Sequence, residues 1–300
     1  MIDPEILAQV KRIQVRTNRL VTDVMSGGYT SVFRGTGIEF DEVREYVEGD
    51  DPRMVDWNVT ARTGRPYVKK YMEERELTVL FLLDVSASTG FGTTPDQRGG
   101  VRTVRETAAE FCACIALAAQ RNNDKTGLIA FSDRTELYVP AKKGSFHVLR
   151  LIRDVLALEA GGSGSDLRAA LDYAGRVQRK RAIVFVISDF LVDDFQQALS
   201  LVARRHDVVA VRIMDPKTQE LPRAGLLHLR DLETGRAAWV DTGSRRVRQA
   251  YAAAMKRQEA QLLDSFKRAH VDHMKVWPHR SVADPIVRFF QMRELRGAHR

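Results

Sequence analysis

An apolar run that ends abruptly in polar residues constrains the fold of this chain more than any other feature. Residues 77–83 read Leu-Thr-Val-Leu-Phe-Leu-Leu, and Asp84, Ser86 and Ser88 follow on alternate positions. The run has the length of a strand and no polar alternation, which is typical of a strand buried on both faces of a parallel sheet. Ligands of open α/β sheets bind where such strands end. Carboxylate and hydroxyl oxygens suit Mg²⁺, Mn²⁺ or Ca²⁺, so the sequence predicts a cation site there.

The pattern after residue 77 alternates between strands and helices, which predicts an α/β fold. We expect a mostly parallel, Rossmann-like sheet with helices on both faces over residues 76–300, and a hairpin insertion near 222–242. The helix that ends at Arg205 should be capped by Asp193 and Asp194. The other expected strands cover residues 126–131, 181–189, 207–214 and 271–277, with hairpin pieces at 136–139, 226–231 and 236–241. The other expected helices cover residues 103–121, 146–158, 167–177, 244–269 and 284–296.

Residues 1–75 have a different character. Residues 4–25 carry apolar side chains at helical spacing, which predicts one or two amphipathic helices. Residues 29–76 are too polar for a core of their own, and we expect them to fold against the domain that follows. Charged residues between 37 and 62 would either form ion pairs that pin this segment or form a surface for a partner. These residues are Arg44, Asp50, Asp51, Arg53, Asp56 and Arg62.

Composition narrows the class of protein. The chain has 300 residues, of which 44% are apolar and 29% charged, as in ordinary globular proteins. No apolar segment approaches the ~20 residues that a membrane helix needs. The first residues lack the layout of a signal peptide, so we expect a cytoplasmic protein without a membrane span. Cys112 and Cys114 lie in an apolar helical pattern and should be buried free thiols.

Positive charge is concentrated near the C-terminus. Residues 243–300 hold 13 Lys and Arg and 5 Asp and Glu, within a chain of net charge +8. Such a region could meet nucleic acid, a membrane surface or an acidic protein. Aromatic residues are not interleaved with the basic ones as a stacking platform for single strands would require. We therefore expect no nucleic acid partner and interpret the region as a solvated helix face.

Two further loops should reach the same sheet edge as Asp84. A glycine-rich loop carries Ser163 and Ser165, and Asp189 follows a buried strand. The set resembles the von Willebrand factor A domain with its metal-ion-dependent adhesion site, which combines Asp-x-Ser-x-Ser with a second-loop threonine and a third-loop aspartate. The resemblance implies that Asp84, Ser86, Ser88 and Asp189 bind Mg²⁺, or alternatively Mn²⁺ or Ca²⁺. Its second-loop position falls on Ser165, with Ser163 as the alternative, and has serine where the family usually has threonine.

A second resemblance covers residues 36–92. Gly-x-Glu-Phe-Asp-x-Val-Arg-Glu-Tyr is followed by Gly-Asp-Asp-x-Arg-x-x-Asp-Trp, Ala-Arg and Glu-Glu-Arg-Glu ahead of the metal motif. These motifs are similar to the bacterial domain-of-unknown-function family 58. Members typically occur beside MoxR-type AAA+ ATPases. The resemblance implies joint action with such an ATPase in assembling or maturing other proteins.

These features favour binding over catalysis. Two carboxylates balance the charge of a divalent cation, and an open position would accept an Asp or Glu of a protein partner. We therefore expect a non-enzymatic adaptor or co-chaperone that binds its partner through Mg²⁺. A hydrolase or phosphotransferase is the first alternative, although no general base is evident near the three loops. A basic surface for nucleic acid or membranes is the second. For the motif itself, the alternative is that Asp84 caps a helix while Ser86 and Ser88 satisfy turn amides.

Overall fold

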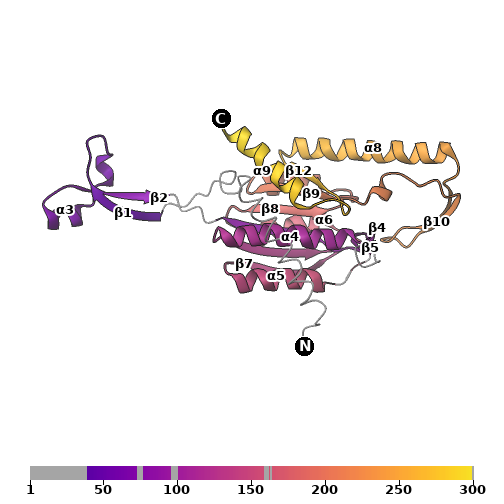
Figure 1. Cartoon of the computed structure of the whole chain (residues 1–300), viewed down its shortest axis with the longest axis horizontal. Coiled ribbons are helices and arrows are strands. Elements are labelled where there is room, and N and C mark those ends of the chain that lie inside the picture. Colours follow the sequence, from indigo (N-terminus) through magenta and orange to yellow (C-terminus); the bar gives the residue numbers. More distant parts are fainter. Residues whose placement is uncertain (1–38, 73–76, 96–100, 159–161, 163, 299–300) are drawn as a thin grey trace. The chain divides into compact units, whose positions relative to one another are not determined.

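The computed structural model describes residues 39–72, 77–95, 101–158, 162 and 164–298. These residues fall into two compact units (Figure 1). One unit contains the described residues from Thr78 onward, and the other ends at Leu77. Each unit is described by itself below.

The unit that begins at Thr78 is built on a six-stranded sheet in the order β12-β9-β8-β3-β6-β7. The apolar run before Asp84 forms β3, which is buried along most of its length and pairs in parallel with β6 and β8. β7 runs antiparallel at one edge. The expected mostly parallel sheet is therefore confirmed. The strands are β3 (Thr78–Asp84), β6 (Lys125–Phe131), β7 (Thr135–Lys142), β8 (Ile183–Ser188), β9 (Asp207–Ile213) and β12 (Asp272–Val276).

Helices cover both faces of this sheet, as Figure 1 shows. α4 and α5 pack on one face, while α6, α7 and α8 pack on the other; α9 packs along β12. Side chains alternate between the two layers because successive residues of a strand point to opposite faces. The helices are α4 (Val104–Arg121), α5 (Ser145–Ala157), α6 (Leu167–Val177), α7 (Gln196–Ala203), α8 (Arg245–Arg268) and α9 (Ala283–Ala298).

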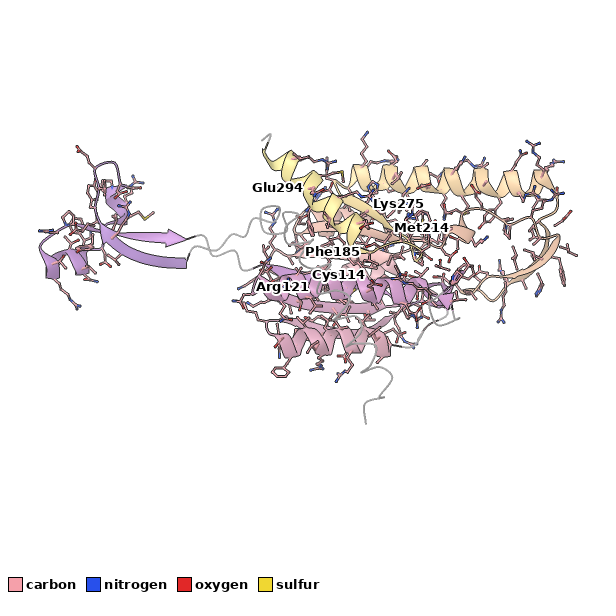
Figure 2. All side chains as sticks on the ribbon, viewed as in Figure 1. Cys114, Arg121, Phe185, Met214, Lys275 and Glu294 are labelled. Atoms are coloured by element: carbon pink, nitrogen blue, oxygen red, sulfur yellow. The ribbon has the colours of Figure 1, made fainter. Side chains whose placement is uncertain are left out.

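The two apolar layers hold the sheet between the helices. Leu80 and Leu82 join a buried cluster with α6, α7 and α8. On the other face, the ring of Phe185 lies 6.0 Å from that of Phe81 and meets Phe111 of α4 edge-on at 5.7 Å. Figure 2 shows Phe185 and Cys114 inside the molecule, and both are fully buried. Cys112 and Cys114 are buried free thiols, as expected.

The predicted cap of α7 is wrong. Asp193 and Asp194 precede the helix, but the residue at its N-cap is Phe195, which makes no side-chain capping hydrogen bond. Phe195 is 1% exposed and packs in the core, so burial of its ring sets the start of the helix. Asp194 has a φ of 60° in the turn before it. The other strands and helices predicted after residue 77 are confirmed, with ends that differ by a few residues.

The unit that ends at Leu77 consists of a two-stranded sheet and short helices. β1 (Glu39–Glu45) pairs antiparallel with β2 (Tyr67–Met72), and η1 (Pro52–Met54) and α3 (Trp57–Thr63) lie between them in the chain. Among its side chains that the structure describes, Val68 is the one buried apolar residue. This agrees with the expectation of a segment too polar for a large core.

Three aspartates of this unit serve local structure. Asp51 and Asp56 accept backbone N–H groups at the starts of η1 and α3. Asp50 makes a bidentate ion pair with Arg44, at 2.7 and 2.8 Å. The helices expected over 4–25 lie outside the described residues. The division at residue 75, and the packing of this unit on the sheet, stay predictions.

Candidate metal centre

Asp84 is the residue on which the predicted site converges. It is the last residue of β3 and is 1% exposed. Its Oδ1 accepts the Ser86 N–H at 3.0 Å. Its Oδ2 accepts two hydroxyls, from Ser165 at 3.0 Å and from Ser188 at 2.8 Å. Three segments far apart in the sequence therefore meet at one carboxylate, the third of them through Ser188 rather than the predicted Asp189.

The first loop presents two hydroxyls side by side. The Oγ atoms of Ser86 and Ser88 lie 3.1 Å apart. The chain turns here through η2 (Ala87–Gly90), and the Thr89 hydroxyl donates to the Ser86 carbonyl at 2.7 Å. Ser86 is buried and Ser88 is partly exposed, so the hydroxyls lead from the interior toward solvent.

Arg105 of α4 forms hydrogen bonds with this loop. Its guanidinium donates to the carbonyls of Val85 and Ser86 and to the Thr89 hydroxyl, at 3.2–3.4 Å. Burial lowers the pKa of Arg105, and the negative charge of Asp84 opposes that effect. The sequence gives no signal for Arg105, because nothing in an amphipathic helix pattern marks which polar side chain turns toward a loop.

The second loop contributes Ser165. The N–H of Asp166 donates to the Ser132 carbonyl at 2.8 Å and so ties this loop to the β6–β7 turn. Gly162 allows the close approach, because a Cβ there would lie 2.5 Å from the Ser132 hydroxyl. Ser163, the alternative ligand, lies outside the described residues.

The third loop contributes Ser188 and Asp189 at the end of β8. Phe190 has a φ of 57° and is buried, with its ring 5.1 Å from that of Phe266. Backbone strain of this kind is held only where surrounding packing requires it. We infer that the anchored ring fixes where Asp189 points. Sequence reasoning missed Ser188, although its place at a strand end next to Asp189 is a usable signal.

The Asp189 carboxyl is electrostatically perturbed. Burial, and next the negative charge of Asp84, raise its pKa to about 6. The Leu191 N–H, 3.0 Å from Oδ1, and the Ser88 hydroxyl oppose this rise. Arg212, itself buried on β9, donates from Nε to the Asp189 carbonyl at 3.2 Å. Two carboxylates that repel each other at a sheet edge form a site suited to a cation.

The pKa of a third carboxyl responds to the charges of these two. Glu233 belongs to the turn of a hairpin formed by β10 (Leu226–Arg230) and β11 (Ala237–Asp241), as expected from the sequence. Burial and the charge of Asp189 raise the pKa of Glu233, whereas the Ser88 hydroxyl lowers it. The Ser88 hydroxyl thus lowers the pKa of both the Glu233 and the Asp189 carboxyl.

The chemistry of these groups fits a hard divalent cation. The donors are carboxylate and hydroxyl oxygens, with no sulfur or imidazole among those described at the site. Adjacent oxygen ligands of an octahedral Mg²⁺ lie about 3.0 Å apart, for metal–oxygen distances near 2.1 Å. The Ser86–Ser88 separation of 3.1 Å suits two such positions, as it also suits a hydrogen bond. Within the described residues, no group of three or more His, Cys, Asp or Glu is arranged to hold a metal by itself, so hydroxyls would have to complete the set.

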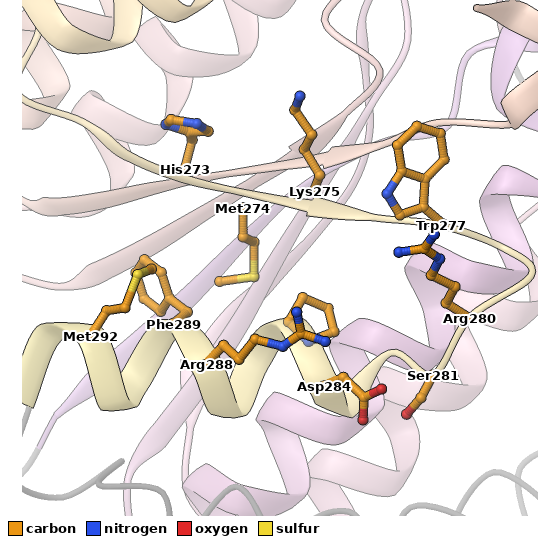
Figure 3. Close-up of a pocket in the computed structure, with 11 residues that line it drawn as sticks. His273, Met274, Lys275, Trp277, Arg280, Ser281, Asp284, Arg288, Phe289 and Met292 are labelled. Atoms are coloured by element: carbon orange, nitrogen blue, oxygen red, sulfur yellow. The ribbon is translucent and has the colours of Figure 1, made fainter.

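A separate cavity of about 270 Å³ lies between β12 and α9. Its lining includes Met274, Phe289 and Met292 together with the charged residues Asp284 and Arg288. Figure 3 shows Met274 pointing toward α9 and Lys275 pointing away from it. None of the predicted metal ligands lines this cavity.

Comparison with known sequences gives a family match. Residues 42–261 match the family model described as "Protein of unknown function DUF58". The uncharacterized protein Rv1480 of Mycobacterium tuberculosis strain H37Rv is 31% identical over 236 residues, which cover 78% of this chain and 73% of that protein.

Solved structures show weaker likenesses. An aerotolerance-related membrane protein from Bacteroides fragilis NCTC 9343 has a TM-score of 0.49 and 15% identity, covering 73% of this chain and 99% of its own. The SpRpn10 VWA domain has a TM-score of 0.37 and 11% identity, and the match covers 70% of this chain and 93% of that domain. The fold of this chain is therefore established by its own sheet order and helix layers. None of its described helices is long and apolar enough to cross a membrane.

Proposed function

The chain belongs to the DUF58 family and has a von Willebrand factor A-like α/β fold, and from this premise we propose that it is a metal-dependent protein-binding module. The observation that carries the proposal is the meeting of three loops at Asp84, through hydroxyls of Ser165 and Ser188 and the Ser86 N–H. Asp84, Ser86, Ser88, Ser165 and Asp189 would hold Mg²⁺, with Mn²⁺ or Ca²⁺ as substitutes.

The exposure of these residues suits binding of an outside ligand. Asp84 and Ser86 are buried, whereas Ser88, Ser165 and Asp189 are partly exposed. A cation held by the second group would keep a position open toward solvent, where a partner's Asp or Glu could coordinate it. Bound hydroxyls add no negative charge, so the cation would still attract an acidic side chain.

A single carboxylate–metal contact is insufficient for specificity, because both groups must first lose water. Loop surface around the site would supply the remaining contacts. Leu191, two residues after Asp189, is 42% exposed, and Val101 of the short strand β5 (Val101–Arg102) is 51% exposed. These apolar side chains are candidates for the rim of a partner interface.

The nature of the partner follows from the family resemblance. Family members typically occur beside MoxR-type AAA+ ATPases, so we propose such an ATPase, or a protein it remodels, as the partner. In this role the chain acts as an adaptor or co-chaperone in protein assembly or maturation, inside the cytoplasm and without chemistry of its own.

The test is affinity capture of the AAA+ ATPase by this chain with Mg²⁺ or with a chelator. We expect capture by the wild type in Mg²⁺, and loss of capture in chelator or with Asp84→Asn. Asp193→Asn, which changes an exposed acid on the neighbouring loop, should behave as the wild type. Equal capture in chelator would refute the metal-dependent mechanism.

A metal-dependent hydrolase or phosphotransferase is a second candidate, and Glu233 favours it. Burial and the charge of Asp189 raise the pKa of Glu233, and a carboxylate with a raised pKa can act as a general base. The sequence offered no such group. In this case the protein should turn over p-nitrophenyl phosphate with Mn²⁺, and Glu233→Gln should abolish turnover. Absence of turnover with Mg²⁺, Mn²⁺ and Ca²⁺ would remove this candidate for phosphoesters.

A further inference from the structure

The six-stranded sheet ends at β12, and no strand of the described residues pairs with the outer side of β12. The sheet order places β12 last, beside β9. The Val276 carbonyl accepts the N–H of Met214, the residue after β9, at 3.2 Å and so points toward β9. Backbone groups of successive strand residues point to opposite edges, so those of His273 and Lys275 point outward. Such an edge offers N–H and C=O groups to a further strand.

The cavity between β12 and α9 lies along this outer edge. The side chains of Met274 and Lys275 point to opposite faces of the strand, as Figure 3 shows, yet both residues line the cavity. A hollow that is bordered from both faces of a strand passes the edge of that strand. Its volume of about 270 Å³ is below the range of about 300–1,000 Å³ that is typical of sites for small molecules. The cavity therefore suits one or two side chains rather than a cofactor.

Much of the lining of this cavity is apolar. Met274 is 6% exposed and Phe289 is 2% exposed, whereas Met292 is 50% exposed and so reaches the surface. Trp277 and Pro285 also line the cavity, and both are partly exposed. When a peptide adds to a sheet edge, alternate side chains of the peptide enter pockets beside that edge. An apolar side chain of an added strand would cover this lining.

The charged residues of the cavity favour an acidic occupant. Arg280 and Arg288 are exposed, and neither forms an ion pair within the part of the chain that the structure describes. In Figure 3 their guanidinium groups lie between the ribbons of β12 and α9. Lys275 is already paired with Glu259 of α8, and Asp284 is the one carboxylate among the described residues of the lining. Two unpaired arginines against one aspartate leave an excess of positive charge.

We propose that β12 accepts an extended acidic segment of a partner protein as an additional strand. The outward backbone groups of β12 would supply hydrogen bonds, and an apolar side chain of the segment would enter the cavity. Asp or Glu side chains of the segment would pair with Arg280 and Arg288. None of the predicted metal ligands lines the cavity, so this docking surface does not depend on the proposed metal site.

The probe is the fluorescently labelled peptide Glu-Ile-Glu-Ile-Glu with both ends blocked, titrated with the full chain and followed by fluorescence anisotropy. A chelator is present, so that the carboxylates of the peptide cannot bind a metal ion on the chain. We expect saturable binding with a Kd below about 1 mM, and the same affinity for Asp84→Asn. The peptide Lys-Ile-Lys-Ile-Lys should bind at least about tenfold more weakly, because its charges repel the two arginines. Absence of saturable binding, or equal binding of both peptides, would overturn the proposal.

Strand addition is tested with two further acidic peptides, methylated on the backbone nitrogens of either the Ile or the Glu residues. One of these two sets of nitrogens faces β12 in an added strand, because successive backbone groups point to opposite edges. Methylation of that set should weaken binding by at least about tenfold, since hydrogen-bond donors are lost. Methylation of the other set should leave the affinity of the parent peptide. Unchanged binding of both methylated peptides would refute strand addition.

A charge reversal tests whether the peptide binds at this cavity. Arg288→Glu should weaken binding of the acidic peptide by at least about tenfold, because attraction becomes repulsion. Arg257→Glu changes an exposed arginine of α8 that does not line the cavity, and this matched control should keep the wild-type affinity. Equal affinities of the two variants would place the peptide elsewhere and overturn the assignment of the cavity.

Discussion

At the scale of single residues, Asp84 combines a structural role with the proposed binding role. Its carboxylate is buried and accepts hydrogen bonds from Ser86, Ser165 and Ser188. Asparagine keeps one acceptor oxygen, and serine hydroxyls can reverse to accept from its amide. The substitution should therefore separate folding from metal binding.

We expect Asp84→Asn to unfold near the wild-type temperature without Mg²⁺, and to lose the stabilisation that Mg²⁺ provides. A ligand at 100 times its Kd stabilises by about 2.7 kcal/mol, which for a domain of this size raises Tm by roughly 5–10 °C. Thermal unfolding with and without Mg²⁺ measures this, with Asp193→Asn as the control. A rise in Tm that persists in Asp84→Asn would contradict the assignment.

Asp189 should make metal binding sensitive to pH. Because its pKa is about 6, protons compete with the cation for the Asp189 carboxylate under mildly acidic conditions. From pH 7 to about pH 5, we expect the affinity for Mn²⁺ to fall by about tenfold, because the ionised fraction drops tenfold per pH unit below the pKa. Isothermal titration at constant ionic strength measures the affinity.

Protonation of Asp189 would not lower the Mn²⁺ affinity by unfolding the chain. Its folded-state pKa is raised, so protonation favours the folded chain as pH falls through about 6. Glu233 also has a raised pKa. If Asp189 causes the fall in Mn²⁺ affinity at acidic pH, the Glu233→Gln variant should show the same fall. An affinity that is flat between pH 7 and about pH 5 would show that Asp189 does not ligate through its ionised form.

At the scale of secondary-structure elements, the start of α4 depends on a reciprocal cap. The Thr103 hydroxyl accepts the Glu106 N–H at 3.1 Å, and the Glu106 carboxylate accepts the Thr103 N–H at 2.9 Å. We expect Thr103→Ala to lower the free energy of unfolding by about 1 kcal/mol. Ser244 is the N-cap residue of α8 and makes no side-chain capping hydrogen bond. Ser244→Ala should therefore change the free energy of unfolding by less than about 0.5 kcal/mol. Urea unfolding of both variants measures the difference, and equal effects would contradict the role of the cap.

At the scale of the whole sheet unit, Arg293 ties the last helix to two strands. From α9 its guanidinium reaches Asp207 at 2.7 and 2.8 Å and Asp272 at 2.7 Å, at the starts of β9 and β12. The arginine side chain is 14% exposed and the two aspartates 30% and 34%. We expect Arg293→Met to lower the free energy of unfolding by about 2 kcal/mol. This is less than the loss on breaking a fully buried ion pair, because solvent screens the two aspartates. Chemical unfolding measures this; Arg288→Met, at an exposed position of the same helix, should be nearly neutral.

Much of the sheet unit could be predicted because its strands are buried on both faces. Continuous apolar runs such as those of β3, β8 and β9 leave few other interpretations. The start of α7 could not be predicted, because burial of Phe195 overrides the local preference of Asp193 and Asp194 for a cap. β1 and α3 were missed as well, since their polar residues show no clear hydrophobic period.

By itself the sequence determined the buried strands, and with them the edge at which Asp84 and Asp189 emerge, because apolar periodicity is a local property of the chain. Only the tertiary structure decided that Ser165 and Ser188, 81 and 104 residues away, donate to the same oxygen of Asp84. It also decided that Arg105 supports the first loop. Such contacts depend on the path of the whole chain through space, which no local pattern of residues encodes.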